Sequence, residues 1–331
     1  MKVLIFEYIT GGGLNKQALP DSLLSEGRLM LAALVDNFSR LKQIDLVVML
    51  DARLVGAIEL PGVEIVSIGV LEDSHAAFEQ LIPYCDAVWP IAPESDGILA
   101  TLCRSVAAQA KPLLTSPADA VMQTANKYTV YQQLNRHHIA TVPTQHLSAA
   151  QYEFGDWVVK PIDGAGCAGT RIVADRQDFE GIRSTKGTVQ LIIQPHLHGQ
   201  KTSLSCLFKG GRVWLLCVNL QQFDIVNKHY KLTGISVNHQ LADNHGYQQI
   251  IDGIARAFPC LWGYAGVDLI ETPEQLWVLE INPRLTTSFV GIYAALGINV
   301  AEQVLRLLNG EPCWRSSANQ AISITIGQGC L

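Results

Sequence analysis

Two carboxylates and an amide near the C-terminus are placed where they could bind a metal ion. Asp268 and Glu280 lie on two predicted strands that a short turn joins. If the hairpin centres near Glu274, Asp268 lies opposite Glu280, and Asn282 is two residues further along the same face. Facing carboxylates repel each other unless a cation lies between them, and hard oxygen ligands suit Mg²⁺ or Mn²⁺. The alternative is an ordinary surface hairpin whose acids face solvent.

Two lysines and a glycine-rich loop upstream favour the metal site. Lys160 ends an apolar predicted strand, where a charge needs a partner, and Lys127 lies in a predicted helix. The loop after Lys160 contains Gly164, Gly166 and Gly169, which allow backbone N–H groups to approach an anion. It is neither a Walker A loop nor a dinucleotide fingerprint, because no Gly-Lys-Ser/Thr ends it and a strand follows it. Together these groups can hold phosphate oxygens.

A hinge-like segment, residues 194–197, ends the predicted strand at 189–194. Its backbone groups can contact the edge of an adenine, and Gln194 can add a side-chain contact. His196 and His198 could be metal ligands, but no acidic or cysteine partner lies at helical or zinc-finger spacing. The sequence therefore favours hinge or surface histidines.

Composition limits the function classes. A chain of 331 residues with 48% hydrophobic and 16% charged residues is expected to form two or three domains. Its net charge of −6 offers no footprint for nucleic acid, and its apolar runs are too short to span a membrane. The eight cysteines form no CxxC pair, which indicates free thiols in the cytoplasm. We expect a cytoplasmic protein with small-molecule partners, and a homo-oligomer is left open.

The element pattern predicts an α/β protein. The first third alternates strands and helices, which is typical of a mostly parallel sheet with ligands at the strand ends. Strands are expected at 2–6, 45–50, 63–68 and 86–91, and helices at 22–41, 73–81 and 94–110. Beyond a boundary near 115–117, strands are expected at 157–161, 171–174, 189–194, 203–208, 212–218 and in the hairpin, and helices at 118–138, 177–184, 248–258, 290–296 and 300–308.

Taken in order, these motifs resemble the ATP-grasp superfamily over about residues 115–310. The resemblance implies an ATP-grasp fold behind an N-terminal βα (pre-ATP-grasp) domain, with an N-terminal domain at 1–115, a small lobe at 116–190 and a large lobe at 191–331. It also implies an ATP-dependent ligase that joins a carboxylic acid to an amine through an acylphosphate.

The same resemblance assigns roles to the candidate residues. Arg284 would stabilise charge in catalysis, and two Mg²⁺ or Mn²⁺ ions would bind at Asp268, Glu280 and Asn282. The ATP-binding set would be Lys127, Lys160, Gly164, Gly166, Gly169, Gln194, Pro195, His196 and Leu197. Many superfamily members carry a ribose-binding glutamate shortly after the hinge, where this chain has Lys201, so the ribose contact is unassigned.

A narrower resemblance rests on two short segments, 6–13 and 282–288, which are similar to the tyramine–L-glutamate ligases. It implies that the side-chain carboxylate of L-glutamate is joined to tyramine, in the biosynthesis of methanofuran-type cofactors. The loop after the first strand would then bind substrate through Glu7, Tyr8, Thr10, Gly11, Gly12 and Gly13. Glu7 and Tyr8 are candidates for the tyramine pocket, although either can instead pack against or cap the loop.

Three alternative functions differ in how well these residues fit them. A ligase for another amino acid and amine would share every nucleotide residue. A non-catalytic ATP-binding subunit fits the intact metal and arginine set less well, and neither glycine loop has the spacing of a nicotinamide oxidoreductase. The sequence leaves open which carboxylate is activated.

Overall fold

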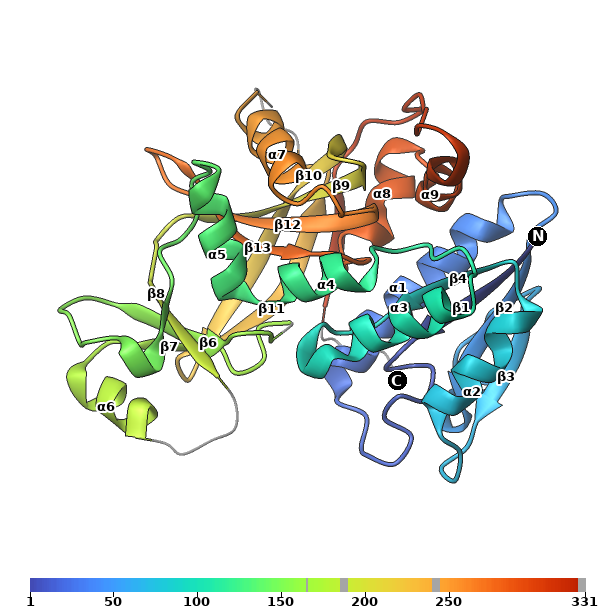
Figure 1. The fold of residues 1–331 in the computed structure, drawn as a ribbon, viewed down its shortest axis with the longest axis horizontal. Helices are drawn as coiled ribbons and strands as arrows, with labels where there is room; N and C mark the ends of the chain where they lie inside the picture. The colour runs from blue at the N-terminus through green and yellow to red at the C-terminus, as the bar shows by residue number, and fades with distance from the viewer. Residues whose placement is uncertain (165, 185–189, 240–244, 327–331) are drawn as a thin grey trace.

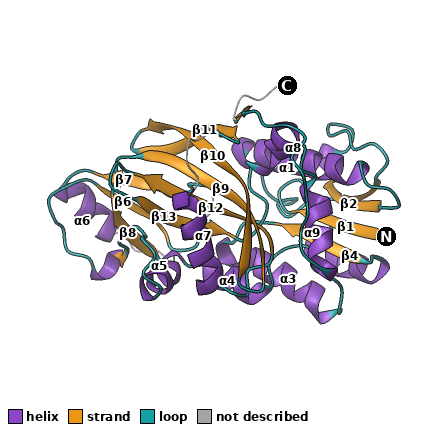
Figure 2. Cartoon of the chain, turned by 90° about the horizontal axis from the view of Figure 1, so that it is seen from above, coloured by secondary structure: helices purple, strands orange, loops and turns teal. Residues whose placement is uncertain are grey.

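Two separate sheets organise the chain (Figure 1). The computed structural model describes residues 1–164, 166–184, 190–239 and 245–326. Seen from above, the smaller sheet and its helices lie at one end of the molecule, and the larger sheet forms the rest (Figure 2). The larger sheet carries Lys160 and the hairpin, so it positions most of the candidate site.

The N-terminal sheet is wholly parallel, in the order β3-β2-β1-β4. Its central strands are apolar and buried on both faces, as parallel strands covered by helices must be. The predicted helix 94–110 begins only at Ile98, because Asp96 and Gly97 have positive φ values of 55° and 67°. The elements are β1 (Lys2–Glu7), α1 (Asp21–Ser39), β2 (Asp45–Asp51), β3 (Glu64–Ile68), α2 (Ser74–Leu81), β4 (Ala87–Ile91) and α3 (Ile98–Ala108).

The larger sheet is antiparallel along the path β13-β12-β9-β10-β11-β7-β6-β8-β5, with β14 on β11. Strand β11 was not predicted. It forms a hairpin with the extended β10 through Asn227 and Lys228, which have positive φ values of 51° and 65°, as in a type I′ turn. The strands are β5 (Gln145–His146), β6 (Trp157–Pro161), β7 (Arg171–Val173), β8 (Leu191–Pro195), β9 (Gln200–Lys209), β10 (Arg212–Val226), β11 (His229–Val237), β12 (Gly263–Glu271), β13 (Leu276–Asn282) and β14 (Ile322–Thr325). Val189, the predicted start of β8, lies outside the described residues.

The predicted helix 118–138 is two helices. Asn126 leaves the helical region at φ −84° and ψ 103°, and its side chain accepts a hydrogen bond from the Thr129 backbone N–H at 2.9 Å. Lys127 therefore begins a helix instead of lying inside one. The helices are α4 (Ala118–Ala125), α5 (Lys127–Arg136), α6 (Arg176–Ser184), α7 (His245–Ala257), α8 (Phe289–Leu296) and α9 (Val300–Asn309). Among the described residues, no helix is both long enough and apolar enough to cross a membrane.

Hydrophobic packing joins the N-terminal sheet to the end of the chain. One cluster combines residues of α1 and β1 with residues of α8 and α9. Asn37 reinforces this contact, because its Oδ1 accepts from the Val300 N–H at 3.0 Å and its carbonyl from Asn299 at 2.7 Å. Helices α4 and α5 pack with α7 and β13, whereas residues 147–193 have a small core of their own. The predicted small lobe thus contributes to two cores, and its boundaries stay a prediction.

Candidate active site

One open cavity lies where β6, β8, β12 and β13 approach each other, and it encloses about 1300 Å³ of empty space, part of which is open solvent. Of the predicted nucleotide, metal and catalytic residues, it is lined by Lys127, Lys160, Gly164, Gly166, Gln194, Pro195, His196, Leu197, Asp268, Glu280, Asn282 and Arg284. Gly169 is not among the lining residues, although its neighbours Ala168 and Thr170 are.

The hairpin of β12 and β13 has the register that the sequence predicted. Asp268 pairs with Glu280, and Gly266 pairs with Asn282. Asn282 Nδ2 donates to Asp268 Oδ2 at 3.0 Å, and Gln221 Nε2 donates to Asp268 Oδ1 at 3.1 Å. These bonds fix the Asp268 carboxylate and leave the amide oxygen of Asn282 available to a ligand.

The pKa values of the two carboxylates are shifted in opposite directions. Burial, and then the nearby charge of Glu280, raise the pKa of Asp268. Burial also raises the pKa of Glu280, but Lys127 and Lys160 more than offset it, so its net pKa is lowered. Without a cation, Asp268 is therefore the carboxylate that holds a proton. The oxygen-rich donor set and this unfavourable pairing both fit a divalent hard cation between them.

Both lysines lie close enough to Glu280 to lower its pKa. Lys127 Nζ lies 2.5 Å from the Gly164 carbonyl oxygen and 3.6 Å from Glu280 Oε2. Lys160 is 6% exposed, and burial lowers its pKa to about 8 although Glu280 acts in the opposite direction. Folding thus keeps a poorly solvated cation where an anionic ligand would stabilise it.

The glycine loop requires glycine at defined points. Gly166 and Gly169 have positive φ values of 61° and 71°. A Cβ at Gly169 would lie 2.9 Å from Pro161 Cγ, and one at Gly164 would lie 3.1 Å from Pro161 Cβ. Ala165 lies outside the described residues.

The hinge segment uses its side chains mostly for internal contacts. Gln194 is 3% exposed, and its Nε2 donates to Thr144 Oγ1 at 2.8 Å, so the predicted adenine contact would come from the backbone. Lys201 donates to the Leu197 carbonyl at 3.0 Å, and burial lowers its pKa to about 8. Lys201, which stands where many superfamily members carry a ribose-binding glutamate, therefore binds the backbone of the hinge segment.

Arg284 is oriented by an acid that sequence reasoning missed. Its Nε lies 2.9 Å from Glu94 Oε1, one terminal nitrogen donates to Glu94 Oε2 at 3.0 Å, and the other to the Leu285 carbonyl at 3.1 Å. Burial lowers the pKa of Arg284, but Glu94 more than offsets it, so the net pKa is raised. A guanidinium has five N–H bonds, and in these contacts each terminal nitrogen uses one of its two. Because Glu94 follows β4, the N-terminal domain sets the direction of this cation.

The loop after β1 is turned inward. The Glu7 carboxylate accepts from the Thr10 N–H at 2.7 Å and the Thr10 hydroxyl at 2.6 Å, and Glu7 is 2% exposed. Burial raises the pKa of Glu7 although these bonds oppose the rise. None of the six predicted substrate residues, Glu7, Tyr8, Thr10, Gly11, Gly12 and Gly13, lines the cavity. Of the two roles left open for Glu7, the geometry shows the cap, and direct substrate contact by this loop stays a prediction.

Glu26 is the acid that does face the cavity from the N-terminal domain. It lies on α1, lines the cavity, and its Oε2 accepts from the Thr287 hydroxyl at 2.6 Å. A single glutamate in an amphipathic helix carries no sequence signal for such a role. The fold alone brings Glu26 to the side of the cavity where Arg284 lies.

Comparisons with known proteins agree with this arrangement. A family model described as an ATP-grasp domain matches residues 124–288, and one described as a pre ATP-grasp 3 domain matches residues 44–121. Among solved structures, an ATP-grasp superfamily protein from Archaeoglobus fulgidus superposes with a TM-score of 0.73 at 24% identity, covering 98% of this chain and 92% of that one. An L-amino acid ligase from Bacillus licheniformis shares the fold at a TM-score of 0.66 and 16% identity, over 95% of this chain and 75% of that one.

The chain belongs to the ATP-grasp family, as a carboxylate–amine ligase with an N-terminal pre-ATP-grasp domain. Within that family it is similar to a protein of Methanocaldococcus jannaschii named tyramine–L-glutamate ligase. The two are 25% identical over 314 residues, which is 93% of this chain and 90% of the relative. The predicted fold and enzyme class are thereby confirmed.

Proposed function

We propose that the chain uses ATP to join the side-chain carboxylate of L-glutamate to tyramine, in the biosynthesis of a methanofuran-type cofactor. The observation that carries the proposal is the convergence of Lys127, Lys160, the Asp268–Glu280 pair and Arg284 on one cavity. Two cations for phosphate, an oxygen site for a metal and an oriented guanidinium are the groups that phosphoryl transfer to a carboxylate needs. The relative named for tyramine and glutamate supports the choice of substrates.

Each group has a defined task in this reaction. Asp268, Glu280 and Asn282 would hold Mg²⁺ or Mn²⁺, which neutralises phosphate charge when bound. Lys127 and Lys160 bind phosphate oxygens as the glutamate carboxylate attacks the γ-phosphate and ADP leaves. Arg284 then stabilises the negative oxygens of the acylphosphate and of the tetrahedral species, which forms when the deprotonated amine of tyramine adds to the acyl carbon and collapses as phosphate leaves. Closing the glycine loop keeps water from the acylphosphate.

Glu26 gives the amine a place to bind. Tyramine is a cation with a phenol and no carboxylate, so its site should offer an acid and apolar walls. Glu26 is the acid that α1 presents to the cavity, and Thr287 fixes its carboxylate. A negative charge there would attract the ammonium group and disfavour tyrosine, whose added carboxylate it would repel.

A coupled assay for ADP release tests the proposal. ATP, Mg²⁺, glutamate and tyramine together should release ADP and phosphate and yield one amide, and fragmentation of the product should place the bond at the side-chain carboxyl. Tyrosine should be a much poorer substrate than tyramine. ADP release that depends on a different amine would retain the ligase and refute tyramine, and no amine-dependent release at all would favour a nucleotide-binding subunit.

Glu26→Gln separates amine recognition from nucleotide binding. The variant keeps the shape of the side chain and removes its charge, so the KM for tyramine should rise by roughly tenfold or more, the scale of a charge-assisted hydrogen bond. The KM for ATP should stay within about twofold, because the nucleotide residues are untouched. Asp21→Asn, at an exposed position on the same helix, is the matched control. An unchanged KM for tyramine in Glu26→Gln would refute this role.

A further inference from the structure

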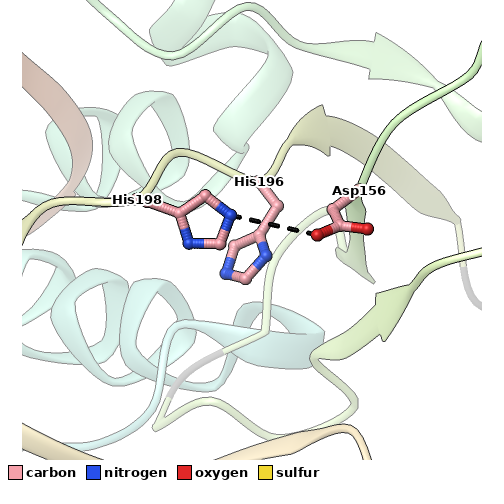
Figure 3. A group of neighbouring side chains, drawn as sticks. All are labelled: Asp156, His196 and His198. Atoms are coloured by element: carbon pink, nitrogen blue, oxygen red, sulfur yellow. Dashed lines mark ion pairs between the residues drawn. The ribbon is translucent and has the colours of Figure 1, made fainter.

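Two histidines and an aspartate meet beside the hinge (Figure 3). Asp156 lies immediately before β6, whereas His196 and His198 follow β8. One nitrogen or oxygen atom from each residue lies within 4.8 Å of those from the other two. The sequence did not predict a metal site here, because no acid lies at helical or zinc-finger spacing from the two histidines. The antiparallel pairing of β6 with β8 brings Asp156 to them from far upstream in the chain.

The backbone already holds the three residues together. The His196 N–H donates to the Asp156 carbonyl at 2.9 Å, so the two segments keep a fixed separation. His198 Nε2 lies 3.9 Å from Asp156 Oδ2, and the two imidazole rings have centroids 4.5 Å apart. The side chains of His198 and Asp156 are 76% and 50% exposed, which leaves them free to turn by the small amount that a shared ligand requires.

The ring of His196 provides the second, independent observation. Its Nε2 lies in hydrogen-bond contact with the Tyr230 hydroxyl. Its Nδ1 is buried and has no hydrogen-bond partner among the described residues. A buried polar atom without a partner destabilises the folded state, and such atoms in folded proteins call for a ligand, ion or water. In Figure 3 the three side chains converge, and Nδ1 is the ring nitrogen of His196 that Tyr230 leaves available.

We propose that Asp156, His196 and His198 form a binding site for a divalent transition-metal ion of the Zn²⁺ class. Two imidazoles and one carboxylate are ligands that zinc accepts with a fourth position open, whereas Mg²⁺ prefers oxygen ligands alone. Tyr230 would act as the outer partner of His196, because the tautomer whose Nε2–H donates to the Tyr230 hydroxyl is the one that presents the Nδ1 lone pair. This site is separate from the oxygen-rich pair on β12 and β13.

The ion would connect the hinge to the segment that enters β6. Because the hinge would bind adenine through its backbone, the ring of His196 is available for a metal. An ion bound here stabilises the folded chain by an amount that grows with the logarithm of its concentration relative to the Kd, so the Tm should rise with added Zn²⁺.

Calorimetric titration of the tag-free, full-length protein with ZnCl₂ tests the site. Excess Mg²⁺ is present throughout to occupy the carboxylates of β12 and β13. We expect one Zn²⁺ per chain with micromolar or tighter affinity and a matching rise in Tm. His198→Ala and Asp156→Ala should each weaken binding by at least about tenfold, the scale of losing a group that supports a metal. His137→Ala, which removes an exposed histidine at the end of α5, should bind as the wild type does.

Cobalt gives a second readout, which reports the coordination geometry of the bound ion. Co²⁺ bound by this set should show the visible absorption of a four-coordinate ion, and His198→Ala should lose it. Circular dichroism checks that the variants fold, as the exposure of both side chains leads us to expect. Equal Zn²⁺ affinity in the wild type and in His198→Ala, or a wild-type Co²⁺ complex without that absorption, would overturn the site.

Discussion

Replacing Lys160 by methionine should stabilise the nucleotide-free protein while it weakens ATP binding. The side chain is 6% exposed, and burial lowers its pKa from 10.5 to about 8. At about 1.36 kcal/mol for each pKa unit, carrying the charge at pH 7 costs the folded state on the order of 3 kcal/mol. Methionine keeps the apolar stem and removes the charge, so Lys160→Met should unfold at a higher urea concentration.

The stability difference between Lys160→Met and the wild type should depend on pH. The folded pKa of Lys160 lies below its unfolded value, so the penalty is fully present below pH 8. Between about pH 8 and 10.5 the folded protein releases this proton first, and the wild type gains stability relative to the variant. The advantage of Lys160→Met should therefore be largest at pH 7 and shrink towards pH 10. Urea unfolding with EDTA and without nucleotide measures this difference.

Lys160→Met should weaken nucleotide binding although it stabilises the nucleotide-free protein. ATP phosphates favour the charged lysine and raise its pKa, so at pH 8 the wild type should take up a fraction of a proton on binding ADP or ATP. Calorimetry in two buffers with different ionisation enthalpies detects that proton, and Lys160→Met should lack it and bind about 10-fold to 100-fold more weakly. Lys42→Met, at an exposed position, should change stability by less than about 0.5 kcal/mol and binding not at all. A Lys160→Met protein that is less stable at pH 7 yet binds nucleotide normally would show that Lys160 is a structural residue.

Three further substitutions test other parts of the site. Glu280→Gln should lower kcat by roughly two orders of magnitude at saturating Mg²⁺, since it removes a metal ligand's charge, and near-normal turnover would contradict the metal assignment. Glu94→Gln should leave Arg284 without its buried counter-charge and cost about 3–5 kcal/mol in urea unfolding, and an unchanged midpoint would mean that the pair contributes little. Glu7→Gln keeps the shape of the loop acid and should leave the KM for ATP unchanged, whereas a rise in the KM for tyramine alone would restore its predicted substrate role.

The parts of the site that the sequence predicted are those that local rules determine. Strand alternation and a short turn fix a hairpin register, so the pairing of Asp268 with Glu280 could be read from spacing alone. Lys160 could be singled out because a charge at the end of an apolar strand needs a partner. The parallel N-terminal sheet followed from the alternation of apolar runs with helical periods.

The parts that could not be predicted depend on contacts between distant segments. Glu94 and Glu26 come from the N-terminal domain, and only packing against α8 and α9 brings that domain to the cavity. Asp156 reaches the hinge histidines through the pairing of β6 with β8. The β10–β11 hairpin was not predicted. Its outer residues are exposed, Ile225 and Val226 among them, so burial of one face does not impose a period-2 pattern near the turn.

The charges of the cavity indicate why nucleotide and metal should bind together. Folding favours a proton on Asp268, because burial and Glu280 raise its pKa, and favours the loss of one from Lys160. A divalent cation at the carboxylates would release the proton of Asp268, and phosphates at the lysine would stabilise its charged form. Either ligand alone would leave Asp268 or Lys160 in its less favourable state. Glu280 joins the metal site to the phosphate site, because it faces Asp268 on one side and Lys127 on the other. The cavity is therefore suited to the neutralised pair of a metal and a nucleotide, which is the form in which a phosphoryl group can be transferred to a carboxylate.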